Sequence, residues 1–269
     1  MPKLTDDITA SLPDAKGRKF GWIQPIEVQD NKWTIDLELD DTSIPSVADM
    51  RSISPPVYDQ GDFNSCTANA ISALIAILRI KHLLKTMTPS RMFLYWFSRK
   101  SLNLETGDYG STISATILSA IQSGYCSEQA WPYTLEHLLK APDLSTSNEA
   151  LTHKLVTPKK LSTSNQIKSA IAHGHPVAVG IRIHNSFFEA DQNDGQVPMP
   201  DLNTVSFGHA GLLIGYDDTS QNFIMRNSWG LRNHDGTPCG DGGHYYLPYD
   251  YVNDGLASEF WIILTTNDS

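Results

Sequence analysis

Hydrophobic residues dominate the stretch 67–80 on every side of the helix that it would form. A helix that is apolar nearly all round lies in a core rather than on a surface. Two more helices are predicted, one at 90–100 after the start signal Thr88-Pro89-Ser90 and one at 111–123. We therefore expect residues from about 49 to 160 to be mainly helical, with a polar linker at 141–148.

The pattern changes after about residue 161, where short apolar runs alternate with clusters of Gly, Asp and Asn. One short helix is predicted at 165–173. Strands are predicted in five places: 177–183, 209–216, 223–227, 243–247 and 260–265. A helical half followed by a strand-rich half predicts an α+β fold with two lobes, a helical lobe at 49–160 and a β-rich lobe at 161–269.

Composition narrows the classes of partner. With 40% hydrophobic and 19% charged residues, the chain has the make-up of an ordinary globular protein. Its net charge of −10 and pI of about 5.2 argue against nucleic acid and anionic membranes, which both require basic patches. The apolar runs stay below the ~18 residues of a membrane span, and residues 1–7 lack the pattern of a signal peptide.

The chain has three cysteines, so at most one internal disulfide can form and no disulfide framework holds the fold. If Cys66 has a chemical role, Cys126 and Cys239 are left, and nothing in their local sequence favours a bridge between them.

Cys66 stands at the start of the apolar helix, six residues after Gln60. The unpaired N–H groups of a helix N-terminus favour a thiolate over a thiol, and a thiolate is a strong nucleophile. The side-chain amide of Gln60 is a donor that could stabilise an oxyanion. A histidine and an orienting polar residue elsewhere would complete a thiol hydrolase.

His209 is the candidate base, and Asn227 is the candidate orienting residue. They lie at the ends of two predicted strands joined by the turn 217–221, and their midpoint, residue 218, falls inside that turn. An antiparallel hairpin would place them within a residue or two of direct opposition. The asparagine oxygen could then fix the tautomer of the histidine while the other ring nitrogen faces the sulfur. Trp229 could shield this hydrogen bond from water.

The order Gln, Cys, His, Asn resembles that of papain-like cysteine peptidases. Gln60-Gly61-Asp62-Phe63-Asn64-Ser65-Cys66-Thr67-Ala68 resembles the nucleophile motif of that family, and Asn227-Ser228-Trp229-Gly230 matches its Asn-Ser-Trp-Gly motif. Further similar segments are Ala48-Asp49-Met50-Arg51, Gly124, Trp131-Pro132-Tyr133 and Gly240-Asp241-Gly242-Gly243. Three departures flank the nucleophile: Phe63, Asn64 and Thr67 stand where the family has Cys, Gly and Trp, as in a bacterial, disulfide-poor branch.

The resemblance implies a papain-like fold, with a helical lobe and an antiparallel β-barrel-like lobe flanking a cleft. It implies an endopeptidase without a cofactor, in which Cys66 and His209 form a thiolate–imidazolium pair and Gln60 stabilises the oxyanion. Gly110 and Ser111 would pair with the substrate backbone. The residue two before the cut would then be apolar, since its pocket would be lined by Thr112, Ile113 and Phe207. Trp229 would also contact the substrate.

The resemblance raises two expectations beyond the cleft. Residues 1–48, which are polar and acidic with strand-like pieces such as 33–37, would be either a pro-segment in the cleft or an extra structural arm. A monomer is expected, and a location outside the cytoplasm is favoured because most relatives work outside the cytosol or in acidic vesicles.

Other interpretations remain open. The same Cys and His chemistry serves transglutaminases, amidases and acyltransferases, and a papain scaffold can also serve as a catalytically weak or inactive binding protein. A metal site is disfavoured. His173 and His175 form a thin ligand set, and the spacing of His234, Cys239 and His244 fits a glycine-rich surface loop.

Overall fold

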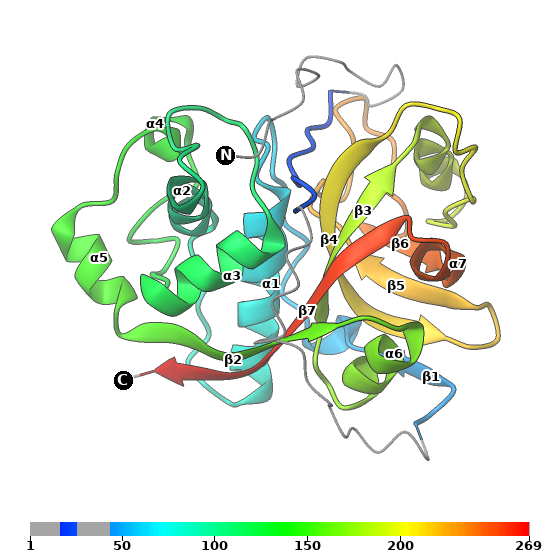
Figure 1. The fold of residues 1–269 in the computed structure, drawn as a ribbon, viewed down its shortest axis with the longest axis horizontal. Coiled ribbons are helices and arrows are strands. Elements are labelled where there is room, and N and C mark those ends of the chain that lie inside the picture. The colour runs from blue at the N-terminus through cyan, green and yellow to red at the C-terminus, as the bar shows by residue number, and fades with distance from the viewer. Residues whose placement is uncertain (1–16, 26–43, 269) are drawn as a thin grey trace.

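The computed structural model describes residues 17–25 and 44–268. It has a helical lobe and a lobe built on an antiparallel sheet, which lie side by side in Figure 1. The strand-like piece expected at 33–37 lies outside the described residues.

The helical lobe is centred on α1 (Cys66–Lys81), which is buried on all sides, as the apolar run predicted. Next to it lie α2 (Arg91–Ser101) and α3 (Ile113–Gln122). Each of these begins at a side-chain cap: Ser90 accepts a hydrogen bond from the N–H of Phe93, and Thr112 accepts one from Ala115. The short helix α4 (Leu135–Leu138) completes this part of the lobe.

Two expectations for the helical lobe were wrong. The polar stretch 141–148 contains a helix, α5 (Leu144–Ala150), because the Asp143 side chain caps its first turn and Ala150 is buried. Residues 153–161 form a strand, β2 (His153–Leu161). Its alternation is weak, and its extended shape comes from pairing along its length with β7 (Ala257–Asp268).

The sheet has the strand order β2-β7-β3-β4-β5-β6. Four of these strands were predicted within a few residues: β3 (Val177–Ile183), β4 (Phe207–Asp217), β5 (Asn222–Arg226) and β6 (His244–Pro248). The sheet is antiparallel and open rather than a closed barrel, which corrects the barrel-like expectation. The seventh strand, β1 (Val47–Asp49), pairs with β4.

The remaining elements pack around the sheet. They are the helices α6 (Ser164–Ala172) and α7 (Asp250–Asn253) and the 3₁₀ helices at Arg51–Ile53 and Asn185–Gln192. All three cysteines are buried free thiols. Within 17–25 and 44–268, no helix is both long enough and apolar enough to cross a membrane.

Candidate active site

The start of α1 packs against β4, and this contact brings Cys66 to the junction of the two lobes. Cys66 is the first residue of the helix and is fully buried. Burial raises the pKa of its thiol to about 12, against the opposing effect of backbone N–H groups, first that of Ala210 and then those of Thr67 and Cys66 itself. The influence of the Ala210 amide shows that the sulfur lies beside the residue that follows His209.

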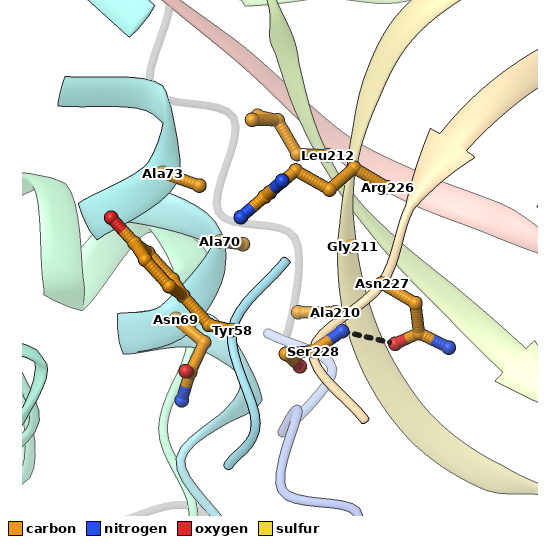
Figure 2. A pocket seen from close by; sticks show the side chains of 10 residues that line it. All are labelled: Tyr58, Asn69, Ala70, Ala73, Ala210, Gly211, Leu212, Arg226, Asn227 and Ser228. Carbon is orange, nitrogen blue, oxygen red and sulfur yellow. Dashed lines mark hydrogen bonds between the residues drawn. The ribbon is translucent and has the colours of Figure 1, made fainter. Parts of the chain in front are cut away.

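His209 and Asn227 meet as the hairpin predicted, with 2.7 Å between His209 Nε2 and Asn227 Oδ1. The same oxygen accepts a hydrogen bond from the backbone N–H of Ser228 at 2.7 Å, drawn in Figure 2. Nδ1 of His209 is buried and has no hydrogen-bond partner within the described chain. The ring of Trp229 lies over His209, with centroids 4.5 Å apart. One ring nitrogen is therefore held, and the other is available for chemistry.

The register of the hairpin explains how the two residues reach each other. Leu212 pairs with Arg226, so Asn227 continues the strand two residues out of direct opposition to His209. A bulge between Leu213 and Gly215 reduces this offset from three residues to two. Arg226 helps to fix the end of β5, because its guanidinium donates to the carbonyl oxygens of Pro55 and Pro56.

Figure 2 places Arg226 in a small cavity between α1 and the sheet, opposite Tyr58 and beside Asn227 and Ser228. The Arg226 guanidinium lies 5.0 Å from the centre of the Tyr58 ring. Burial lowers the pKa of Arg226 to about 10, so it stays charged at neutral pH. The cavity is lined by residues of α1, β4 and the end of β5, among them Asn227 and Ser228.

Gln60 is fully buried and its side chain is fixed in orientation. Its Oε1 accepts a hydrogen bond from Ser228 Oγ at 2.7 Å. Its Nε2 donates to the carbonyl oxygen of Phe63 at 2.8 Å and to that of Lys19 at 3.1 Å. The donor expected to meet an oxyanion is thus bound to a carbonyl oxygen from the N-terminal part of the chain.

The loop before the nucleophile is held without a disulfide. The N–H of Asn64 donates to the carboxylate of Asp108 at 3.0 Å, and Asn64 Nδ2 donates to the carbonyl oxygen of Asp108 at 2.7 Å. Phe63 packs edge-on against Tyr133, with ring centroids 5.2 Å apart. The residues that replace the family's Cys and Gly therefore anchor the loop through hydrogen bonds and aromatic packing.

Residues 17–25, hereafter the N-terminal strap, lie across the site between the two lobes, where Figure 1 shows them in blue between α3 and β4. On the sheet side, the N–H groups of Gly21 and Trp22 point at the carbonyl oxygen of Gly208, each at 3.2 Å. On the helical side, Ser111 donates to Gly21 at 2.8 Å and accepts from Ile23 at 2.9 Å. Ser111, expected to pair with substrate backbone, thus pairs with the strap.

Trp22 of the strap fills a pocket at the start of α3 and is 5% exposed. Room for its ring comes from Gly180, where an added Cβ would lie 2.1 Å from the indole. Its Nε1 donates to Oε2 of Glu259 at 2.6 Å. The same carboxylate accepts from the N–H groups of Ile113 at 3.0 Å and Ser114 at 2.6 Å.

Glu259 was not anticipated, and it makes this pocket less apolar than expected. It is 6% exposed and has a φ of 58° beside a bulge in the β3–β7 pairing. Burial raises its pKa, and hydrogen bonds from Ser114, Trp22 and Ile113 oppose that rise. The one sequence signal was an isolated acid before the apolar run 260–263.

The other expected substrate-binding residues lie around the strap. Phe207 stacks on Phe20, with centroids 5.5 Å apart, and Trp229 meets Phe20 edge-on at 6.1 Å. An added Cβ at Gly110 would lie 2.2 Å from the carbonyl oxygen of Gly21, so the strap passes directly over that glycine. Thr112 caps α3 and is mostly buried.

Known proteins similar to this chain share this architecture. A family model described as "Papain family cysteine protease" matches residues 44–250. An uncharacterized peptidase C1-like protein of Acanthamoeba polyphaga mimivirus is 33% identical over 223 residues, covering 78% of this chain and 70% of that protein. Xylellain, a cysteine protease from Xylella fastidiosa, matches with a TM-score of 0.82 and 30% identity over 95% of this chain and 99% of its own. Digestive procathepsin L 3 of Tenebrio molitor has the same fold, with a TM-score of 0.69 and 20% identity over 93% and 77% of the chains.

Proposed function

Because this chain belongs to the papain family of cysteine proteases, we propose that it cleaves peptide bonds with Cys66 as nucleophile, His209 as acid and base, and Asn227 as the orienting residue. The observation that carries this assignment is the 2.7 Å contact between His209 Nε2 and Asn227 Oδ1. It leaves Nδ1 as the nitrogen that can exchange a proton with the sulfur.

The proposed reaction has two stages. The proton of Cys66 moves to His209, and the thiolate attacks the substrate carbonyl carbon. The oxyanion is stabilised by the backbone N–H of Cys66 and by Nε2 of Gln60. His209 then donates its proton to the leaving amine, which gives an acyl-enzyme. In the second stage His209 removes a proton from water, which releases the acyl group and restores the thiol.

A peptidyl epoxide, which alkylates an activated thiolate, tests the assignment. In a chain that begins at Ile44, and so lacks residues 17–25, we expect the epoxide to label Cys66, and we expect Cys66→Ala to lose both labelling and peptide hydrolysis. Cys126→Ala is the matched control, because Cys126 is also a buried free thiol but follows α3, outside the hairpin that carries His209. Labelling of Cys66 without hydrolysis of any peptide would instead favour a binding protein.

We also infer that the N-terminal strap holds the enzyme in an inactive form. The Lys19 carbonyl oxygen of the strap accepts a hydrogen bond from Nε2 of Gln60, the proposed oxyanion donor. The strap also pairs with Ser111, and its Trp22 side chain fills the pocket at the start of α3. With the strap in place, Cys66 and His209 are both fully buried. Burial raises the pKa of Cys66 to about 12 and lowers that of His209 to about 4, so the two remain an uncharged pair.

Comparing the full chain with a chain that begins at Ile44 tests this second proposal. We expect faster hydrolysis by the shorter chain, because the oxyanion donor and the pocket become free. Equal rates would refute inhibition by the strap and leave it as a structural arm.

A further inference from the structure

Arg18, the second residue of the strap, enters a second pocket. Its guanidinium is enclosed, with 4% of the side chain exposed, and its Nη2 lies 2.7 Å from Asp191 Oδ2. Nη2 also donates to the Oδ1 of Asn233. The guanidinium carbon lies 4.3 Å from the ring centre of Trp229. These three residues form what we call the Arg18 pocket: Asp191, Asn233 and Trp229.

The carboxylate of Asp191 is held in place by hydrogen bonds that do not involve Arg18. Its side chain is 1% exposed. Oδ1 accepts from the Tyr245 hydroxyl at 2.7 Å and from the N–H of Gly240 at 3.0 Å. Burial raises the pKa of Tyr245 well above its ordinary value, so the hydroxyl stays a donor. These bonds hold one oxygen and leave Oδ2 directed at the pocket.

Asn233 is fixed in the orientation that suits a cation. Its Nδ2 donates to Thr237 Oγ1 at 2.9 Å, with longer contacts to the Pro238 carbonyl and Asp191. The amide oxygen is therefore the atom that faces Arg18. A carboxylate, an amide oxygen and the face of an indole together match a planar guanidinium better than any neutral side chain.

The Arg18 pocket and the Trp22 pocket lie on opposite sides of Gln60 along the strap. Along the strap, the carbonyl of Lys19 is at the oxyanion donor Gln60, and Trp22 is beside Ser111. Arg18 is on the other side of Lys19, against Trp229. The resemblance assigns the Ser111 side to substrate residues before the cut, so the Arg18 pocket faces residues after it.

When the strap leaves, Asp191 is a buried carboxylate without its cation. Such an arrangement is costly unless another cation enters or water reaches the site. We propose that the Arg18 pocket then binds an arginine side chain of the substrate on the leaving-group side of the scissile bond, and that the strap inhibits partly by supplying the same group. This specificity rests on the peptidase function proposed above.

Matched peptides test the pocket without changing the residues that line it. Each peptide carries arginine or its uncharged isostere citrulline at one of the first three positions after the cut. The enzyme is the full chain with Gly21→Val, a change that displaces the strap where it passes closest to the backbone of Asn64. We expect kcat/KM to favour arginine at least tenfold at one position. A ratio near one at all three positions would overturn the proposal.

Two further variants in that background locate the effect. Asp191→Asn should bring the arginine-to-citrulline ratio of kcat/KM to within about twofold, and this ratio cancels any change in activity that both peptides share. Glu189→Gln is the matched control, since it removes a charge from the same 3₁₀ helix at an exposed side chain, and it should keep the full ratio. Retention of the ratio in Asp191→Asn would also overturn the proposal.

Binding separates failure of this proposal from failure of the peptidase assignment. If no peptide is cleaved, the same pairs are titrated into the full chain with Cys66→Ala and Gly21→Val, and fluorescence anisotropy of the labelled peptides is read. At least tenfold tighter binding of the arginine peptide would support the pocket even in an inactive protein. Equal affinities would refute it.

Discussion

Asn227 Oδ1 lies 2.7 Å from His209 Nε2 even though the strands carrying these residues are two positions out of direct register. The two side chains bridge this offset, and the N–H of Ser228 donates a second hydrogen bond to the same asparagine oxygen. The tautomer and orientation of the histidine therefore depend on one amide.

Replacing Asn227 by alanine should lower kcat/KM by roughly ten- to a hundredfold. A positioned general acid–base residue contributes about 10²–10⁴-fold to the rate, and part of this is lost when His209 is no longer held in orientation. The loss should fall mainly on kcat. Steady-state kinetics on one peptide substrate, in the chain that begins at Ile44, measures this loss. Asn222→Ala, which removes a buried asparagine from the other end of β5, should leave kcat within about twofold. An unchanged kcat in Asn227→Ala would remove this residue from the mechanism.

Gly21→Val should release the strap. An added Cβ at Gly21 would lie 1.9 Å from the carbonyl oxygen of Asn64, which is too close for any side chain. We expect the full-length variant to react with a small alkylating agent at Cys66 at least tenfold faster than the unmodified chain. Lys19→Ala is the control, since that side chain is exposed and its carbonyl is retained. Equal rates for all three proteins would contradict an inhibitory strap.

Acidification should favour departure of the strap. Burial lowers the pKa of His209 from 6.5 to about 4, so the strapped form is fully favoured above pH 6.5 and is weakened as the pH falls. The free energy that favours the strapped form over the open form falls by about 1.4 kcal/mol per pH unit, and the total loss reaches about 3 kcal/mol near pH 4. Above pH 9 the raised pKa of Cys66 also weakens the strapped form, because deprotonation of the thiol favours the open form.

Hydrogen exchange at the Trp22 amide, which points at Gly208, measures this pH effect. After correction for the intrinsic exchange rate, protection should be lower at pH 5 than at pH 7.5. His209→Gln, which removes the titrating ring, should flatten the acid side of the profile. Equal corrected protection at both pH values in the unmodified chain would contradict the prediction.

The Trp22 pocket should prefer an aromatic side chain that can donate a hydrogen bond. A bond to a charged acceptor such as Glu259 contributes about 1.5–3 kcal/mol, so a peptide with tryptophan two before the cut should exceed its phenylalanine counterpart by roughly tenfold or more in kcat/KM. Glu259→Gln should reduce that ratio. Equal kcat/KM values for the tryptophan and phenylalanine peptides would instead support the apolar preference expected from the sequence.

Local signals account for what could be predicted. The apolar run after Cys66 and the turn at 217–221 set α1 and the β4–β5 hairpin, and these bring the nucleophile, His209 and Asn227 together. The strand β2 and the helix α5 were missed because tertiary pairing and one capping aspartate decide them.

Long-range contacts account for the site residues that were missed. Glu259 lies 237 residues from Trp22, and Asp191 lies 173 residues from Arg18. No spacing rule connects partners so far apart, and an isolated acid is most often a solvated one. Only the fold brings these carboxylates into pockets.

The loop that carries the nucleophile is held by Asn64, Asp108, Phe63 and Tyr133. This loop contains no disulfide, so thiol reductants have no cross-link to break there. Oxidation of Cys66 should therefore abolish activity without unfolding the protein. A sample inactivated by mild peroxide, which takes a thiolate reversibly to the sulfenic acid, should recover with dithiothreitol at an unchanged melting temperature. Redox state would then govern this enzyme's chemistry without governing its fold.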